Sequence, residues 1–533
     1  MVTPLKNDHI RSTACDSNVR ERLLVATVVL LGATSVLYLF ISTPHLPLLG
    51  PDTPSYLQGR WYRAPGYPAY LHIIWTSFGN MNVATLLQLV VGVTTLGAYL
   101  IGLGKLFRAP LVALAVALYF IPHAHHLRNH LYLMTESPFI TLMLAHFTLT
   151  GLFLGSARFR TVPVCIGISL FAAAACTVRV PGIVLLANLL FLMIRTLNSR
   201  HRLALMIPFL CVLGAWSGLN AYRLGTVSPF VRGGFHQLAN VVHLVEADMP
   251  GKHPELYAFI GARNGSFKPR IAAASSFGEQ NRVAYRITQD MQKRQKEMAG
   301  WKGVRNKYVQ NHLEEVCPGK SLRDKRYHLA VCGDALEKQI AEEVIRHDPA
   351  GFALRVARNF LNYWSRVHVV KHFRGQEFIH RYTQCASTPS CYEQAKDFGL
   401  DYAVGDKYDY MRTVRIPWLN LGSTLSRVEL GKILNLGISA RLSTIVSALE
   451  LLAGVVIAWV FLIRTRLQPS SLRQLSPEFS MVFLLAMTIN AVFLSSSLAH
   501  TGITRYAANL EVLAMTSLVF SLLLTTRRLK LSR

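Results

Sequence analysis

The sequence predicts an all-α polytopic membrane protein, with a bundle of about ten transmembrane helices and a mostly helical domain outside the membrane. Of the 533 residues, 51% are hydrophobic and 16% are charged, whereas a soluble domain usually carries about 25% charged residues. Long apolar runs recur along the chain, and many basic residues stand at their ends. The formal net charge of +27 is therefore attributed to the anchoring and orientation of helices in a membrane, and no nucleic-acid partner is predicted.

The chain contains ten apolar runs that approach the length of about 20 residues needed to cross the hydrocarbon core. The predicted spans are residues 23–41, 83–104, 109–123, 133–154, 162–178, 181–195, 203–221, 442–463, 480–498 and 506–525. The third, fifth and sixth of these are short. The stretch 161–194 is too long for one crossing, and Arg179 and Pro181 interrupt it, so we predict a tight helical hairpin there.

Basic residues in the short loops predict the orientation of these spans. With the N-terminus in the cytoplasm, the short basic clusters all fall on the cytoplasmic side, as the positive-inside rule requires. The prediction is a multi-pass protein of the inner (plasma) membrane, with both termini cytoplasmic. Its parts are a cytoplasmic tail (1–22), an N-terminal transmembrane module (23–221) with a first outer loop (42–82), an extracytoplasmic domain (222–440), C-terminal transmembrane helices (441–526) and a second cytoplasmic tail (527–533).

The long outer segment is predicted to contain two helices within Glu337–Trp364, separated near Pro349. The second, Phe352–Trp364, is amphipathic, and it either lies on the membrane or belongs to a plain solvated helical pair. Four cysteines of this segment allow three pairings, and proximity in sequence favours Cys317–Cys332 and Cys385–Cys391 in an oxidising compartment. A zinc site is the competing interpretation, but the spacing lacks paired C-x-x-C knuckles.

The first candidate functional residues lie in the outer loop Gly50–Tyr70, GPDTPSYLQGRWYRAPGYPAY. Four prolines in this loop prevent a single long helix. The loop places the carboxylate of Asp52 near Arg60 and Arg63 at the membrane surface. A carboxylate there is suited to take the proton from an acceptor hydroxyl, and an arginine is suited to hold a lipid-linked phosphate. The competing interpretation is that Asp52 caps a short surface helix.

A second acid, Glu136, stands at the outer end of the fourth predicted span. A carboxylate within a membrane is costly and by default functional, so Glu136 would orient the acceptor, neutralise an arginine or help to hold a metal. The alternative is that it only caps the helix start together with Thr135. The preceding loop contains His123, His125, His126 and His130. These imidazoles either bind a divalent ion or form a polar interfacial loop, part of which lines the active cleft.

Several short motifs follow one another in a recognisable order. They comprise Asp52, Tyr56 and Arg63-Ala64-Pro65-Gly66-Tyr67-Pro68 in the first outer loop, then Gln88, Thr135-Glu136-Ser137-Pro138, Arg179, Asn220, Arg223, Gly225 and Arg505-Tyr506. This ordered set resembles the GT-C type of membrane glycosyltransferase, most closely the protein O-mannosyltransferase-like and aminoarabinose-transferase-like enzymes. The resemblance covers residues 20–240 and part of 335–525. The chain departs from the family at Thr53, where many relatives carry a second acid, and in its histidine-rich second outer loop, which leaves the metal and the acceptor open.

The resemblance implies a GT-C-like enzyme that moves a sugar from a polyprenyl-phosphate donor to a hydroxyl of a saccharide, lipid or protein acceptor at the outer face, with inversion. Asp52 and Glu136 are the predicted catalytic residues. The predicted substrate-binding residues are Tyr56, Arg60, Arg63, Tyr67, Gln88, His126, Arg179 and Arg505. No cofactor is required, a divalent metal remains an option, and membrane lipids are partners. The alternatives are a transporter or flippase of lipid-linked saccharides and a structural assembly partner; the absence of a visible repeat in the sequence favours the enzyme over the transporter.

Overall fold

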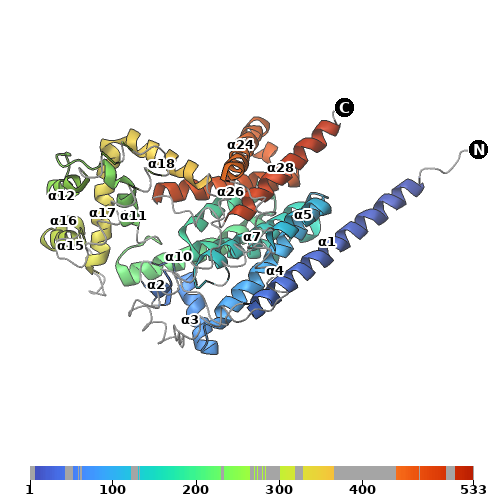
Figure 1. The fold of residues 1–533 in the computed structure, drawn as a ribbon, viewed down its shortest axis with the longest axis horizontal. Helices are drawn as coiled ribbons and strands as arrows, with labels where there is room; N and C mark the ends of the chain where they lie inside the picture. The colour runs from blue at the N-terminus through green and yellow to red at the C-terminus, as the bar shows by residue number, and fades with distance from the viewer. Residues whose placement is uncertain are drawn as a thin grey trace, which may run out of the picture. The chain divides into compact units, whose positions relative to one another are not determined.

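A computed structural model describes most of the chain. The described ranges are 7–42, 52–57, 59–60, 63–121, 130, 132–229, 233–264, 301–318, 328–364, 440–466, 468–499 and 510–531, with a few isolated positions between 269 and 283. Every regular element in these ranges is a helix (Figure 1), as the sequence predicts. The chain divides into two compact units, which we describe separately. Unit 1 comprises Met1–Leu210, His368–Ile489 and Ala508–Arg533, and unit 2 comprises Cys211–Val367 and Asn490–Ala507.

Each predicted span is helical over most of its described residues. Five segments are long and apolar enough to cross a membrane: α4 (Asn82–Leu106), α7 (Glu136–Gly155), α10 (Ser199–Leu224), Ile445–Thr465 of α24 (Ala440–Thr465) and Pro477–Leu498 of α26 (Pro477–Ala499). Shorter apolar helices are α5 (Pro110–Phe120), α8 (Val162–Val178) and Val180–Arg195, which consists of η2 (Val180–Val184) and α9 (Leu185–Arg195). The first and last predicted spans fall in α1 (Asn7–Ser42) and α28 (Glu511–Leu531). The described residues thus include five helices that could cross a membrane by length and composition.

The helical hairpin predicted around Arg179 is confirmed. Helix α8 ends at Val178, Arg179 adopts an extended conformation with φ −146° and ψ 133°, and η2 and α9 follow. The turn brings Gly182 against the end of α8, where a Cβ would lie 2.5 Å from the backbone of Ala175 and Cys176. A glycine is therefore needed at this close approach.

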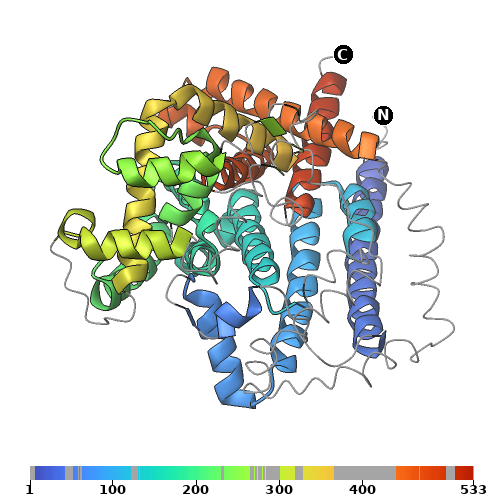
Figure 2. The ribbon, with the colours of Figure 1, turned by 60° about the vertical axis from the view of Figure 1, so that its left-hand side comes forward.

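Helices α4 and α7 form the centre of unit 1. Helices α1 and α5 pack on α4, and α8 packs on α7; Figures 1 and 2 both show α1, α4 and α5 side by side. Buried polar contacts join helices that are distant in sequence. The amide of Asn188 on α9 donates to Thr488 Oγ1 on α26 at 3.0 Å, and the hydroxyls of Tyr99 on α4 and Thr516 on α28 lie 2.8 Å apart. Because lipid offers no hydrogen-bonding partners, such contacts help to select helix neighbours.

Basic residues connect neighbouring helices at one end of this bundle. Lys105 Nζ lies 2.5 Å from Glu21 Oε1 on α1, and Arg527 on α28 donates to the carbonyl of Phe107 at 2.5 Å. Gln88 precedes Lys105 by 17 residues on α4, which corresponds to about 26 Å along the helix axis. The basic end of α4 is therefore far from the end that carries Gln88.

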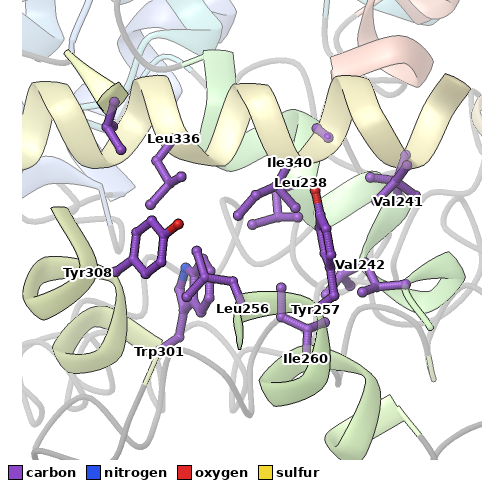
Figure 3. Close-up of a cluster of buried hydrophobic side chains, with 14 of the residues drawn as sticks. Leu238, Val241, Val242, Leu256, Tyr257, Ile260, Trp301, Tyr308, Leu336 and Ile340 are labelled. Atoms are coloured by element: carbon purple, nitrogen blue, oxygen red, sulfur yellow. The ribbon is translucent and has the colours of Figure 1, made fainter. Parts of the chain in front are cut away.

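Unit 2 has a hydrophobic core of its own. Its helices outside the candidate spans are α11 (Gly233–Val241), α12 (Pro254–Asn264), α15 (Trp301–Asn311), α16 (Leu313–Val316), α17 (His328–His347) and α18 (Pro349–Trp364). Figure 3 shows Leu336 and Ile340 directed from α17 toward the rings of Tyr257, Trp301 and Tyr308, all of which are buried. This cluster packs α11, α12, α15, α16 and α17 together.

The predicted separation of two helices near Pro349 is confirmed. Helix α17 ends at His347 and α18 begins at Pro349, a residue favoured in the first turn because it needs no hydrogen-bonded N–H. The side chain of Asp348 accepts a 2.8 Å hydrogen bond from the backbone N–H of Gly351. This capping contact fixes the start of α18.

The predicted disulfide between Cys317 and Cys332 is confirmed, and it links the end of α16 to α17. Both cysteines belong to the hydrophobic core of unit 2. The other predicted pair, Cys385–Cys391, lies outside the described residues.

Replacing both Cys317 and Cys332 by serine is expected to destabilise unit 2. The bond closes a loop with a sequence separation of 15, for which lost chain entropy predicts about 3 kcal/mol. Limited proteolysis of the purified protein across a temperature series should show cleavage within unit 2 at a lower temperature than in wild type. Cys211→Ser, which changes an exposed free cysteine, is the control, and equal behaviour of the two variants would contradict the expectation.

Candidate functional site

The polar loop between α1 and α4 folds into two short helices, α2 (Thr53–Leu57) and α3 (Gly66–Phe78). Asp52 stands directly before α2, and its backbone carbonyl accepts hydrogen bonds from the N–H groups of Ser55 at 3.0 Å and Tyr56 at 3.3 Å. Gly59 follows α2 with a φ of +54°, a conformation that favours glycine. The prediction that this stretch cannot form one long helix is confirmed.

An ion pair joins the two ends of this loop. Nη2 of Arg63 lies 2.6 Å from Oδ1 of Asp52, with the two side chains 22% and 24% exposed. The same guanidinium donates through Nε to Ser55 Oγ at 2.8 Å and through Nη1 to the Tyr56 hydroxyl at 3.4 Å. Its Cζ atom also lies 4.6 Å from the centre of the Tyr56 ring. Asp52 thus precedes a helix, as the capping interpretation requires, and also presents an ion-paired carboxylate that Arg63 orients.

A second carboxylate–arginine pair lies where α7 begins and α8 ends. Nη1 of Arg179 is 3.6 Å from Oε1 of Glu136, and the side chains are 12% and 8% exposed. Glu136 is the first residue of α7, where the helix dipole favours a negative charge. The Cζ atom of Arg179 lies 5.7 Å from the centre of the Phe139 ring, within the range of a cation–π contact. One of the roles expected for Glu136 was to neutralise an arginine, and its ion pair with Arg179 fits that role.

Close packing of α3 on α8 brings the two ion pairs into one region. A Cβ atom on Gly66 would lie 2.6 Å from Thr177 Oγ1 and 3.0 Å from the Thr177 backbone. Arg63 lies three residues before Gly66, and Arg179 lies two residues after Thr177. The contact between this glycine and the end of α8 therefore sets the separation of the two pairs.

Tyr56 lies between the two ion pairs. Its hydroxyl shares a 3.2 Å hydrogen bond with Oγ1 of Thr135, the residue that precedes Glu136. Burial raises the pKa of Tyr56 to about 12, and the charges of both pairs also act on it, because the two arginines lower this pKa and the two carboxylates raise it. The four charged groups therefore form one electrostatic cluster around a phenol that stays neutral below pH 10.

Tyr67 and Gln88 contact each other and the residues around this cluster. The Tyr67 hydroxyl and the Gln88 amide lie 3.0 Å apart, and both side chains are buried. When the amide is oriented so that its oxygen accepts from Tyr67, its nitrogen donates to the carbonyls of Tyr132 at 3.0 Å and His130 at 3.3 Å. The ring of Tyr67 also meets the Tyr56 ring edge-on, with centroids 5.2 Å apart. These two predicted substrate-binding residues thus hold Tyr56 and the segment before α7 in place.

Other polar residues connect the first outer loop to the segment that precedes α7. Thr53 Oγ1 donates to the carbonyl of Leu133 at 2.9 Å, and Nδ1 of His130 lies 2.6 Å from Ser137 Oγ. Sequence reasoning did not assign roles to Thr53 or Ser55, and it gave Thr135 only the alternative role of capping the start of α7 with Glu136. The available signal was that each stands within three residues of a motif acid.

The structure brings together most of the predicted site residues: Asp52, Tyr56, Arg63, Tyr67, Gln88, Glu136 and Arg179. Arg60 is exposed in the same loop, and its backbone N–H donates to the carbonyl of Ser55 at 3.1 Å. His126 and Arg505 lie outside the described residues. Within the described ranges, no group of three or more His, Cys, Asp or Glu side chains is placed to hold a metal ion. The described cluster offers an ionised acid, guanidinium groups and a neutral phenol, which suit proton transfer and phosphate binding.

Comparison of the chain with protein-family models, with curated proteins and with solved structures finds no match. Functional inference therefore depends on the geometry of this cluster and on the motif resemblance.

Gly66→Ala is expected to destabilise unit 1. The added methyl group has no room beside Thr177, and overpacking of this kind typically costs about 1–3 kcal/mol. Gly102→Ala is a matched control within α4, because a Cβ there meets nothing within 4 Å and alanine favours a helix. Thermal unfolding of both variants in detergent tests the expectation. A Gly66→Ala protein as stable as the Gly102→Ala protein would show that the position of α3 does not depend on the close contact between Gly66 and Thr177.

Proposed function

We propose that this chain is a GT-C-type membrane glycosyltransferase that transfers a sugar from a polyprenyl phosphate to an acceptor hydroxyl. The observation that supports this proposal best is the cluster of two carboxylate–arginine pairs around Tyr56, at the start of α7 and the end of α8. Two of these groups, Glu136 and Arg179, stand at the ends of apolar helices, where charged groups are costly and often functional. A proton acceptor beside cations is what sugar transfer from a lipid phosphate requires.

Asp52 acts as the general base in this proposal. It is more exposed than Glu136 and is therefore more accessible to an incoming acceptor. The acceptor oxygen attacks the anomeric carbon while its proton passes to the Asp52 carboxylate. The bond from the anomeric carbon to the phosphate oxygen breaks, and its electron pair remains on the lipid phosphate. One such displacement inverts the anomeric centre and needs no covalent sugar–enzyme intermediate.

The two arginines have different roles in this proposal. Arg63 already binds Asp52, Ser55 and Tyr56, so it orients the base. Arg179 contributes the second guanidinium of the cluster, with its Nη1 3.6 Å from Oε1 of Glu136 and so outside hydrogen-bonding distance of that atom. Arg179 therefore holds the donor phosphate and stabilises the charge that grows on it, while Glu136 balances Arg179 before the donor binds.

The site is proposed to face outside the cell. On α4, Gln88 contacts the cluster through Tyr67, and Lys105 lies about 26 Å away along the helix axis, close to the hydrocarbon thickness of about 30 Å. The positive-inside rule places the Lys105 end in the cytoplasm. The finer arrangement proposed is a ten-span, GT-C-like bundle in an inner (plasma) membrane with both termini cytoplasmic, acting on a saccharide, lipid or protein acceptor.

A transporter or flippase of lipid-linked saccharides is the second candidate. Arginine–carboxylate pairs that open around a phosphate would serve transport as well as transfer. Transporters generally bind their substrates near the bilayer midplane, whereas this cluster is built from a loop and from helix ends. The location favours the enzyme.

Asp52→Asn is expected to lower the rate of sugar transfer by about 100-fold or more, because a positioned general base contributes at least that much. Asparagine keeps the size of the side chain and can still accept a hydrogen bond from Arg63, so folding and donor binding should persist. The assay uses the protein in lipid vesicles with a panel of labelled polyprenyl-phosphate sugars and cell-envelope acceptors. Glu342→Gln, at an exposed carboxylate of α17, is the control. Transfer by Asp52→Asn at the control rate would exclude Asp52 as the base.

Arg179→Gln is expected to weaken donor binding by about 10-fold or more, in line with the loss of a charge-assisted hydrogen bond. Arg63→Gln should instead lower turnover more than donor binding, because it releases the base. Binding of a labelled polyprenyl-phosphate sugar, measured separately from turnover, distinguishes the two. The reverse pattern would overturn the assigned roles, and flipping of the lipid without any transfer would favour the transporter.

A further inference from the structure

Helix α18 (Pro349–Trp364) of unit 2 is amphipathic with its faces inverted. Leu354 and Leu361 are 50% and 47% exposed, whereas Arg355 and Asn359 are buried. A helix on the surface of a soluble domain normally does the opposite, because its apolar stripe faces the core. The outward face of α18 therefore calls for an apolar environment.

Among the described helices of unit 2 other than α10 and α26, only α18 shows this exposure. In the described residues of unit 2 outside α10 and α26, the large hydrophobic side chains that are strongly exposed are Val227, Leu354 and Leu361. The helices that surround the hydrophobic core bury theirs. The apolar surface thus belongs to α18 specifically and is not a general property of the unit.

The polar face of α18 is held inward. The amide of Asn359 donates to Asn240 Oδ1 at 2.9 Å, and the Asn240 amide donates to the carbonyl of Ser497 on α26 at 2.9 Å. Burial, together with the neighbouring charge of Arg358, lowers the pKa of Arg355 to about 10. These contacts fix the rotation of α18 about its axis, so its apolar face remains outward.

The C-terminal end of α18 packs on a candidate membrane span. The ring of Tyr363 stacks on Phe493 of α26 at 5.6 Å between centroids, and the ring of Trp364 meets it edge-on at 5.1 Å. Phe493 lies within the span Pro477–Leu498 and six residues before Ala499, which is about 9 Å along the axis. Interfacial helices lie about 5–10 Å into the headgroup and acyl boundary. Tyrosine and tryptophan are also the side chains enriched at that level.

We infer that α18 lies in the membrane interface, with Leu354 and Leu361 against the acyl chains of the leaflet next to the C-terminal end of α26. The occupant of this face is the lipid surface, because the C-terminal end of the helix packs against a candidate membrane span and its outward side chains are uncharged. This inference does not depend on the proposed enzymatic activity.

Photocrosslinking tests this inference in phospholipid nanodiscs. The photoreactive residue p-benzoylphenylalanine is introduced at Leu354, at Leu361 or, as a control, at Gln310, which is exposed on α15. After irradiation, mass spectrometry should find phospholipid adducts at positions 354 and 361 at least about 10-fold more abundant than at 310. Wild-type protein in nanodiscs with diazirine-tagged acyl chains should carry adducts on the α18 peptide, which gives an answer that does not depend on any variant folding.

Three outcomes would overturn the inference. Lipid adducts at 354 and 361 no more abundant than at 310 would place α18 in water. Crosslinks from these positions to a second copy of the chain would identify the face as a protein interface. Crosslinks to another segment of the same chain would show that the protein itself covers α18.

Discussion

The conformation of the polar loop between α1 and α4 depends on the contacts of the Arg63 guanidinium group. It binds the Asp52 carboxylate, the Ser55 hydroxyl and the Tyr56 hydroxyl, and it also lies over the Tyr56 ring. Only a planar group with several fixed donors makes these contacts at once, so lysine would not replace it. Loss of this arginine would leave a partly buried carboxylate without this partner, which is costly.

Several features could be predicted from sequence because they depend on local patterns. The apolar runs became helices, Arg179 and Pro181 broke one run, Pro349 separated two helices, and nearby cysteines formed Cys317–Cys332. In each case the cause is a side chain or a short segment acting on its own neighbourhood. The number of crossings was harder to establish, because short helices such as α5 and α9 do not meet the length criterion by themselves.

The pairing of charges could not be predicted in the same way. Asp52, Glu136, Arg63 and Arg179 were all identified as candidates, since charged residues in apolar surroundings are unusual. Sequence alone predicted Arg63 as a substrate-binding residue, and the structure adds its contact with Asp52. That pairing depends on the turn after α2 and on the approach of α3 to α8, both of which are tertiary. The small polar residues that complete the network, such as Thr135, carry little sequence signal because hydroxyls are also common at helix starts.

The net charge of the cluster affects how it can bind a phosphate. Two carboxylates and two guanidinium groups around a neutral phenol sum to no net charge. A phosphate entering such a cluster would add negative charge to a weakly solvated site, which is unfavourable without a further cation. Arg60 lies three residues before Arg63 and is exposed, so its side chain is accessible to a ligand. In the proposed mechanism, a phosphate held by Arg179 therefore calls for one further cation, and Arg60 is the arginine nearest to Arg63 along the chain.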